Sequence, residues 1–163
     1  MATLHLLFGP VGSGKTTFAR KLERETHAVR FTHDEWMVHL YGTNPPAAGF
    51  QDAAARVWDL IWMHAERVLQ VGADVILDGG FWSRASRDEA RRRAAAMGAS
   101  CRLYAIDCPR PVARQRVGER TARLPAGALV ISDPTFDALN ARVEPLGADE
   151  NHVRIDGEHL QPA

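Results

Sequence analysis

The sequence predicts an α/β fold in which helices sandwich a parallel, five-stranded sheet. Two observations support this prediction. Short apolar runs alternate with longer amphipathic runs along the whole chain, as is typical of successive strand–helix units. A glycine-rich turn at residues 9–16 joins the first apolar run to the first amphipathic run. In such sheets ligands bind beyond the carboxyl ends of the strands, so we expect the chemistry at that edge.

The expected elements follow one another in a regular order. Strands are predicted at residues 4–8, 29–32, 74–78, 101–107 and 152–155. Helices are predicted at residues 16–24, 34–41, 51–71, 86–98 and 109–120, and a further helix begins at 133. The helix at 51–71 is the clearest, because its apolar residues recur at the spacing of one helical face. Ser86 and Glu89 suit a capping box.

Composition limits the classes of protein to which the chain can belong. Its 163 residues suit one domain, which we place at residues 1–157, followed by a loose tail at 158–163. Twenty basic residues balance twenty acidic ones, which argues against a general nucleic-acid coat, because such binding needs many phosphate contacts. Two cysteines are too few for a disulfide framework, and no apolar run approaches the ~20 residues that span a bilayer. We therefore expect a cytoplasmic monomer or homodimer without membrane contact.

One motif provides most of the functional prediction. Residues 9–16 read Gly-Pro-Val-Gly-Ser-Gly-Lys-Thr and match the P-loop pattern at every fixed position, between a predicted strand and a predicted helix. The glycines let backbone N–H groups converge on phosphate, while Lys15 reaches the outer phosphates and the Thr16 hydroxyl binds Mg²⁺. A tight glycine turn alone would not need Lys followed by Thr. We therefore predict a P-loop NTPase fold with ATP and Mg²⁺ as cofactors. The expected nucleotide-binding residues are Gly9, Pro10, Val11, Gly12, Ser13, Gly14, Lys15, Thr16, Thr17, Arg116 and Arg120.

Two classes of P-loop protein fit the sequence poorly. A GTPase usually has an Asn-Lys-x-Asp guanine-reading motif, which is absent here, since Lys15 and Lys21 are the only lysines. A ring-forming motor ATPase usually has Asp-Glu at its second phosphate-facing strand, and here Asp78 is followed by Gly79. A compact kinase or a simple nucleotide-binding module remains.

Two carboxylates are expected at the ends of strands. Asp78 would orient Mg²⁺ or its waters, or bind substrate, and the alternative is a cap for the glycine turn after it. Asp34 would accept the proton of an attacking hydroxyl. The alternative for Asp34 is an N-cap of the helix that begins at Glu35, which would leave Glu35 as the base.

Arginines gather ahead of a segment without clear periodicity. Arg116, Arg120 and Arg123 are four and three residues apart, so they share one side of a helix. We expect them in a lid, at about residues 116–132, that closes over the triphosphate and offsets charge on the transferred phosphoryl group. The alternative is a solvated arginine face, which we prefer for Arg110 and Arg114.

An acceptor is expected to lie at the same edge. The substrate-binding residues that we predict are Asp34, Trp36, Asp78, Trp82, Arg84 and Arg87. The two tryptophans fall on turns, where an indole could stack on a substrate ring, and the two arginines would hold a phosphate or carboxylate. Trp58 and Trp62 lie at helical spacing and are assigned to the core, and His33 could tune the carboxylate beside it.

Together these positions resemble the small P-loop kinases, a family that includes zeta toxins, chloramphenicol phosphotransferase and the kinase domain of polynucleotide kinase. Besides the P-loop, the similarity rests on Asp34, on the Val-Ile-Leu-Asp strand that ends at Asp78, on Ser-Arg-x-x-Arg at 83–87 and on Arg-x-x-x-Arg at 116–120. The resemblance covers nearly all of residues 3–156.

The resemblance implies a role for several of these residues. Lys15 and Thr16 would bind phosphate and Mg²⁺, and Asp34 would activate a hydroxyl. Arg120 or Arg123 would be a lid arginine near the phosphates. Arg87 would match an arginine that polynucleotide kinases have after the third strand.

We therefore predict an ATP- and Mg²⁺-dependent phosphotransferase that moves the γ-phosphate to a hydroxyl of a small molecule. The predicted catalytic residues are Lys15, Asp34, Arg120 and Arg123, and the predicted metal ligands are Thr16 and Asp78. A small acceptor ranks above a nucleic-acid end, because the chain is neutral and aromatic residues are expected at the rim. The alternatives are a polynucleotide or nucleotide kinase, a non-catalytic ATP-binding module and a simple ATPase.

Overall fold

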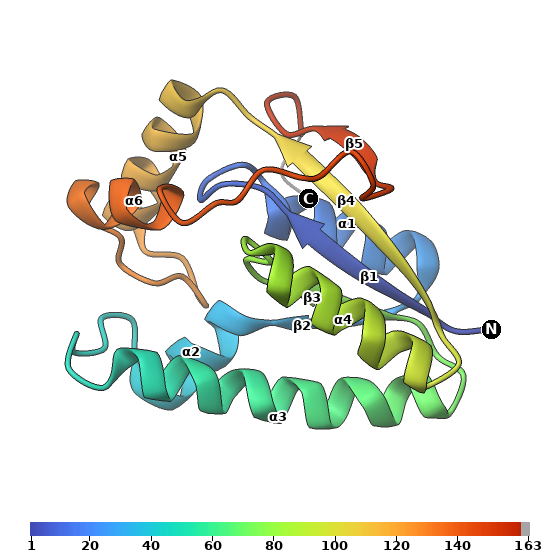
Figure 1. Cartoon of the computed structure of the whole chain (residues 1–163). Coiled ribbons are helices and arrows are strands. Elements are labelled where there is room, and N and C mark those ends of the chain that lie inside the picture. The colour runs from blue at the N-terminus through green and yellow to red at the C-terminus, as the bar shows by residue number, and fades with distance from the viewer. Residues whose placement is uncertain (161–163) are drawn as a thin grey trace.

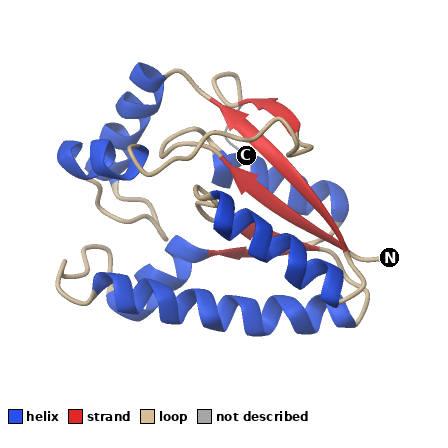
Figure 2. Cartoon of the chain, viewed as in Figure 1, coloured by secondary structure: helices blue, strands red, loops and turns tan. Residues whose placement is uncertain are grey.

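The computed structural model describes residues 1–160, in which strands and helices follow the expected order (Figures 1 and 2). Residues 161–163, the end of the tail predicted at 158–163, lie outside the described residues. The strands are β1 (Thr3–Phe8), β2 (Val29–Thr32), β3 (Val75–Asp78), β4 (Ser100–Asp107) and β5 (Val153–Asp156). The helices are α1 (Lys15–Thr26), α2 (His33–Tyr41), α3 (Phe50–Gln70), α4 (Arg84–Ala96), α5 (Arg110–Arg123) and α6 (Asp133–Asn140).

The five strands form one parallel sheet in the order β2-β3-β1-β4-β5. The predicted five-stranded α/β fold is therefore confirmed. Because all strands run the same way, their carboxyl ends meet at one edge. The register pairs Thr32 of β2 with Asp78 of β3, which places the start of α2 beside the end of β3. Within residues 1–160, no helix has both the length and the apolar character needed to cross a bilayer.

Helices cover both faces of the sheet (Figure 1). On one face, α3 and α4 pack over the strands through side chains such as Val57, Ile61 and Ala90. On the other face, α1 packs through Phe18 and Leu22. This layering follows from strands that are apolar on both faces, which is what a sheet buried between helices requires.

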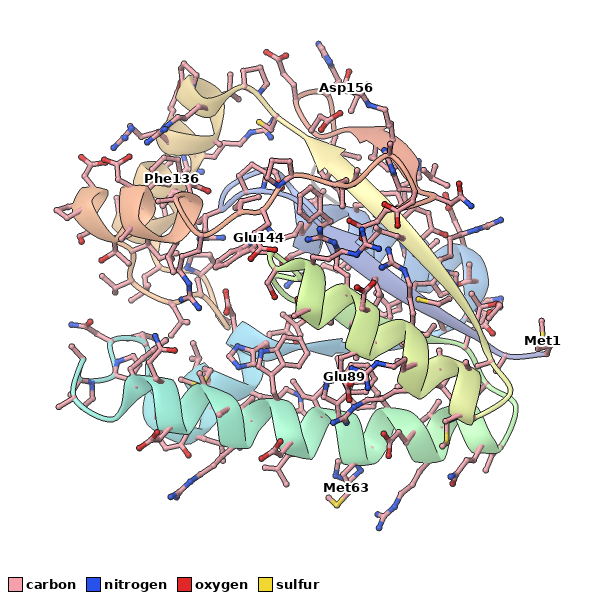
Figure 3. All side chains as sticks on the ribbon, viewed as in Figure 1. Met1, Met63, Glu89, Phe136, Glu144 and Asp156 are labelled. Atoms are coloured by element: carbon pink, nitrogen blue, oxygen red, sulfur yellow. The ribbon has the colours of Figure 1, made fainter. Side chains whose placement is uncertain are left out.

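Helices α5 and α6 lie side by side beyond the carboxyl edge of the sheet. Phe136, labelled in Figure 3, points from α6 toward α5 and is buried against Val11, Ala113 and Val117. This small cluster is separate from the two clusters on the sheet faces. It brings the P-loop, the predicted lid helix and α6 together.

One predicted cap is wrong by a helical turn. Helix α4 begins at Arg84, and its cap is Ser83, whose Oγ accepts a hydrogen bond from the Ser86 N–H at 3.1 Å. Ser83 has the extended backbone that a cap needs. Ser86 already lies inside the first turn, where its hydroxyl donates to the Ser83 carbonyl.

Candidate active site

The P-loop turns sharply between β1 and α1. Gly12 and Gly14 have φ of +80° and +101°, and a Cβ on Gly12 would lie 2.5 Å from the carbonyl oxygen of Ala113. These positions therefore need glycine, both for backbone conformation and for space. The Val11 N–H donates to Oδ1 of Asn140 at 2.9 Å, which ties the loop to the end of α6. The loop leads into the N-terminus of α1, an arrangement that holds phosphate.

The Lys15 ammonium is held by the loop itself. It donates to the carbonyl oxygens of Gly9 at 2.9 Å and Pro10 at 2.7 Å. Burial lowers the pKa of Lys15 to about 8, and the charges of Asp78 and Asp34 oppose that fall. The ammonium is thus bound by the loop and stabilised by the charges of two carboxylates.

We expect nucleotide affinity to depend on the charge of Lys15. Because its pKa is about 8, the ammonium form prevails below that pH and is lost above it. Bound phosphates favour the ammonium, so ATP binding should weaken as pH rises through about 8, and binding should take up protons there. Calorimetric titrations in buffers of different ionisation enthalpy measure both effects. Equal affinity for ATP at about pH 7 and about pH 9, with no proton uptake at the higher pH, would contradict the role of the Lys15 ammonium in binding phosphate.

Asp78 is the buried carboxylate of the site. Its residue is only 3% exposed, and its Oδ2 accepts a hydrogen bond from the Thr32 hydroxyl at 3.0 Å. Burial raises the pKa of Asp78, and the Thr16 and Thr32 hydroxyls and the Lys15 ammonium oppose that rise. The Thr16 hydroxyl and the Asp78 carboxylate are thus neighbours.

These two oxygen donors fit the predicted metal. Mg²⁺ prefers oxygen ligands and usually keeps several waters, so it needs only one or two protein groups besides the phosphates. No cluster of three or more His, Cys, Asp or Glu side chains suited to a metal occurs in residues 1–160. Thr16 and Asp78 therefore suit Mg²⁺ held largely by nucleotide and water, rather than a metal enclosed by protein.

Asp34 lies in the first turn of α2, where its side chain is 49% exposed. Thr32 is the N-cap of this helix, so Asp34 does not have that role. Its Oδ1 lies 3.8 Å from Nδ1 of His33. The adjacent Glu35 is paired with Arg20 at 3.3 Å and Arg30 at 3.1 Å. The structure thus engages the alternative base and leaves Asp34 open to a ligand.

A pocket of about 930 Å³ opens at the carboxyl edge of the sheet and brings the central groups together. The predicted site residues that line it are Val11, Gly12, Gly14, Lys15, Thr16, Thr17, Asp34, Asp78, Trp82, Arg116 and Arg120. Gly9, Pro10 and Ser13 belong to the P-loop without lining the pocket. Trp82 is fixed there because its Nε1 donates to the Gly9 carbonyl at 2.9 Å.

The three predicted lid arginines have different surroundings. Arg120 lines the pocket, and its buried Nε has no hydrogen-bond partner within the described chain. Arg116 also lines the pocket, and its guanidinium donates to the carbonyl oxygens of Gly157 at 2.7 Å and Glu158 at 2.5 Å. The described part of the predicted tail is thus held against α5. Arg123 is exposed at the last residue of α5, about one turn past Arg120, and it does not line the pocket.

Trp36 and Arg84, which were predicted to bind substrate, do not line the pocket. The Trp36 ring packs edge-on against Phe31, with centroids 6.2 Å apart, because this side of α2 faces the core. The Arg84 guanidinium pairs with Asp88 at 2.9 Å and Asp149 at 2.7 Å. It joins α4 to the segment after α6.

Arg87, also predicted to bind substrate, lies in the protein interior and not in the pocket. It is 0% exposed, and its Nε and Nη2 each donate to the Glu150 carboxylate at 2.8 Å. Nη1 donates to the carbonyl oxygen of Phe81 at 3.1 Å. This buried pair fixes the segment after α6 to α4, and nothing remains of Arg87 to contact a substrate.

Removing this buried arginine should destabilise the fold. Removing one partner of a buried ion pair typically costs about 3–5 kcal/mol in the free energy of unfolding. In Arg87→Met, Arg91 remains 2.8 Å from the Glu150 carboxylate, so we expect a loss at the lower end of that range. Arg92→Met, on the exposed side of the same helix, should change it by less than about 0.5 kcal/mol. Urea denaturation of both variants measures the difference. An Arg87→Met protein as stable as wild type would contradict the structural role.

Sequence reasoning missed several residues that line the pocket. Arg142 does so from a turn after α6 that carries no motif. Phe50 and Trp58 do so from α3, whereas Trp62, on the same helix, is buried in the core as predicted. The helical period predicts which face of α3 is apolar, but not which end of that face reaches the site. The N-terminal half of α3 reaches it, where His33 stacks on Trp58.

Comparisons with known proteins agree with this picture. A family model described as AAA domain matches residues 4–146. No curated protein matches the chain. Many solved structures share the fold, and the resemblance to small P-loop kinases is confirmed.

Three of these structures cover nearly the whole chain. A candidate kinase from Chloroflexus aurantiacus J-10-fl has a TM-score of 0.78 at 16% identity, over 97% of this chain and 89% of its own. Kti12 from Chaetomium thermophilum, in complex with ADP-AlF3, has a TM-score of 0.75 at 19% identity, over 94% and 88%. A gluconokinase from Sinorhizobium meliloti 1021 has a TM-score of 0.65 at 15% identity, over 99% and 84%. At such identities the similarity is one of fold.

Proposed function

Since the chain belongs to the AAA domain family of P-loop proteins, we propose that it is an ATP- and Mg²⁺-dependent phosphotransferase that moves the γ-phosphate to a hydroxyl of a small molecule. One observation supports this proposal above the others. A single pocket is lined by Lys15, by Asp34 with its open carboxylate and by Arg120, whose buried Nε has no hydrogen-bond partner among residues 1–160. Phosphoryl transfer to an alcohol needs a cation for phosphate, a proton acceptor for the alcohol, and donors for the charge that develops.

The proposed reaction assigns one task to each group. Lys15 and the P-loop amides hold the β- and γ-phosphates, and Asp34 accepts the proton of the attacking hydroxyl. The alcohol oxygen forms a bond to the γ-phosphorus as the bond to the ADP oxygen breaks. Arg120 offsets charge on the transferred group. Mg²⁺, held by Thr16 and Asp78, would neutralise charge on the β- and γ-phosphates.

We also assign residues 1–157 to one domain with a lid at about 116–132. Two contacts within this segment support its assignment as a lid. The Val130 N–H donates to the Thr43 carbonyl at 2.9 Å, and a Cβ on Gly127 would lie 2.8 Å from Cγ of Glu35. The segment after α5 thus reaches across the pocket to α2 and the loop after it.

An acceptor screen tests the proposal against its rivals. The protein is incubated with Mg²⁺ and ATP labelled in the γ-phosphate, with and without alcohols, nucleotides and oligonucleotides bearing a free 5′-hydroxyl. Label transferred to a small alcohol is the expected result. Transfer to an oligonucleotide or a nucleotide would favour those kinases instead. Acceptor-independent hydrolysis alone would indicate an ATPase, and tight ATP binding without any product would indicate a binding module.

A further inference from the structure

Aromatic side chains line the part of the pocket next to Asp34. The His33 ring stacks on the Trp58 indole, with centroids 4.9 Å apart and planes 22° apart. His33 is fixed in this position by a hydrogen bond between its Nε2 and the Ala54 carbonyl, at 3.0 Å. We call the set His33, Phe50, Ala54, Trp58 and Trp82 the aromatic wall.

Two glycines allow the indoles to pack against the end of β3. A Cβ on Gly79 would lie 2.4 Å from Cζ2 of Trp58, and a Cβ on Gly80 would lie 2.5 Å from Cε2 of Trp82. Any side chain at either position would push an indole away from the backbone that follows Asp78. The Gly79-Gly80 pair therefore allows the Trp58 and Trp82 indoles to pack against the backbone directly after Asp78.

The charges around the wall indicate which acceptors it excludes. In the described chain, the pocket is lined by no carboxylates other than Asp34 and Asp78, and both have tasks in the proposed reaction. The Arg142 guanidinium lies 6.0 Å from the centre of the Trp82 ring, and no ion pair with a described residue neutralises it. An ammonium on the acceptor would therefore meet a like charge and no spare partner.

The lining also limits the number of hydroxyl groups that an acceptor can bury. Apart from the groups assigned to the nucleotide and to the transfer, the polar side chains of the lining outside the wall are Thr32, Asn44, Gln51, Thr135 and Arg142. A sugar or sugar acid packs on an aromatic ring through its C–H groups, and its several hydroxyls point to the sides. More of these hydroxyls than the few polar side chains can partner would lose water without gaining a hydrogen bond. A flat ring loses nothing there and gains stacking and burial.

We propose that the acceptor is an alcohol with a flat ring and no positive charge, whose ring lies against the aromatic wall while its hydroxyl faces Asp34. This inference rests on the proposed function and narrows its substrate class. It assigns Trp58 and Phe50 as specificity residues, and Gly79 and Gly80 as the positions that allow the two indoles to be there.

Equilibrium binding tests this substrate class without relying on turnover. Phenylpropanediol and thymidine are titrated into the protein by calorimetry, with and without Mg²⁺ and saturating ADP. Propanediol, D-glucose, D-gluconate and D-glucosamine serve as comparisons that lack a flat ring, and the last two are also charged. We expect the two alcohols with a flat ring to bind at least about tenfold more tightly than each comparison, since stacking on one aromatic side chain is worth about that factor or more.

Two variants and a matched control assign the effect to the wall. Trp58→Leu and Phe50→Ala should each reduce the preference for the ring at least about fivefold, and the second variant, at the first residue of α3, serves if the first does not fold. Trp36→Leu removes a tryptophan outside the pocket and should keep the preference. Melting curves verify that each variant is folded.

The possible failures are distinguishable. Three results would overturn this inference: a comparison compound that binds as tightly as the alcohols with a flat ring or more tightly, no saturable binding of those alcohols, or an unchanged preference in both wall variants. Label transfer to gluconate but not to phenylpropanediol would overturn it alone and leave the kinase proposal standing. A protein that binds the ring-bearing alcohols but no nucleotide would overturn both, because the wall would then serve no transfer.

Discussion

Lys15→Ala is expected to slow phosphoryl transfer strongly and to weaken ATP binding, while the fold remains. The ammonium contacts the carbonyls of Gly9 and Pro10 in the free protein and would turn to the phosphates when nucleotide is bound. Loss of one charge-stabilising donor typically lowers kcat about 10²–10³-fold. A lost hydrogen bond to a charged group weakens binding by about 1.5–3 kcal/mol, which is about tenfold to more than a hundredfold.

The chain provides its own control for this experiment. Lys21 is the only other lysine; it lies on the same helix, half exposed, 3.9 Å from Glu25. Lys21→Ala removes the same charge outside the pocket and should leave ATP affinity and turnover unchanged. Calorimetry with an ATP analogue and a transfer assay measure both variants. Wild-type nucleotide affinity in Lys15→Ala would contradict nucleotide binding by the P-loop.

Asp34→Asn is expected to lower kcat while ATP affinity stays near its wild-type value. The amide keeps the size of the side chain but cannot take the proton of the acceptor, and general-base catalysis contributes about 10²–10⁴-fold. Loss of a negative charge near Lys15 should not weaken binding of an anion. The kcat of transfer and the Kd of an ATP analogue are measured side by side.

Glu35→Gln is the matched control, because it makes the same change at the adjacent carboxylate. Glu35 is paired with Arg20 and Arg30 and does not line the pocket. Its kcat should therefore change far less than that of Asp34→Asn. The reverse order, a large loss in Glu35→Gln and a small one in Asp34→Asn, would make Glu35 the base.

The fold and the nucleotide half of the candidate site could be predicted from the sequence, because both are local. The P-loop motif occupies eight consecutive residues. Asp78 ends β3 and Asp34 lies two residues after β2, so parallel pairing alone brings them to one edge. The alternation of strands and helices is likewise a property of neighbouring residues. Such patterns need no knowledge of distant contacts.

The acceptor half depends on contacts between segments far apart in the sequence. Arg87 looked like a ligand by its spacing from β3, yet Glu150, 63 residues later, neutralises it in the core. Trp58 looked like core by its period, yet the glycine at 79 lets it reach the pocket. Arg142 follows no motif and is placed by the packing of α6. None of these partnerships leaves a local pattern.

A crystal structure with Mg²⁺ and a non-hydrolysable ATP analogue tests the central claim most directly. We predict that the phosphates lie in the loop of residues 9–16, that the Lys15 ammonium leaves the Gly9 and Pro10 carbonyls for them, and that Asp34 faces the γ-phosphate across a space open to an alcohol. A nucleotide bound elsewhere, or an Asp34 carboxylate turned away from the γ-phosphate, would contradict it.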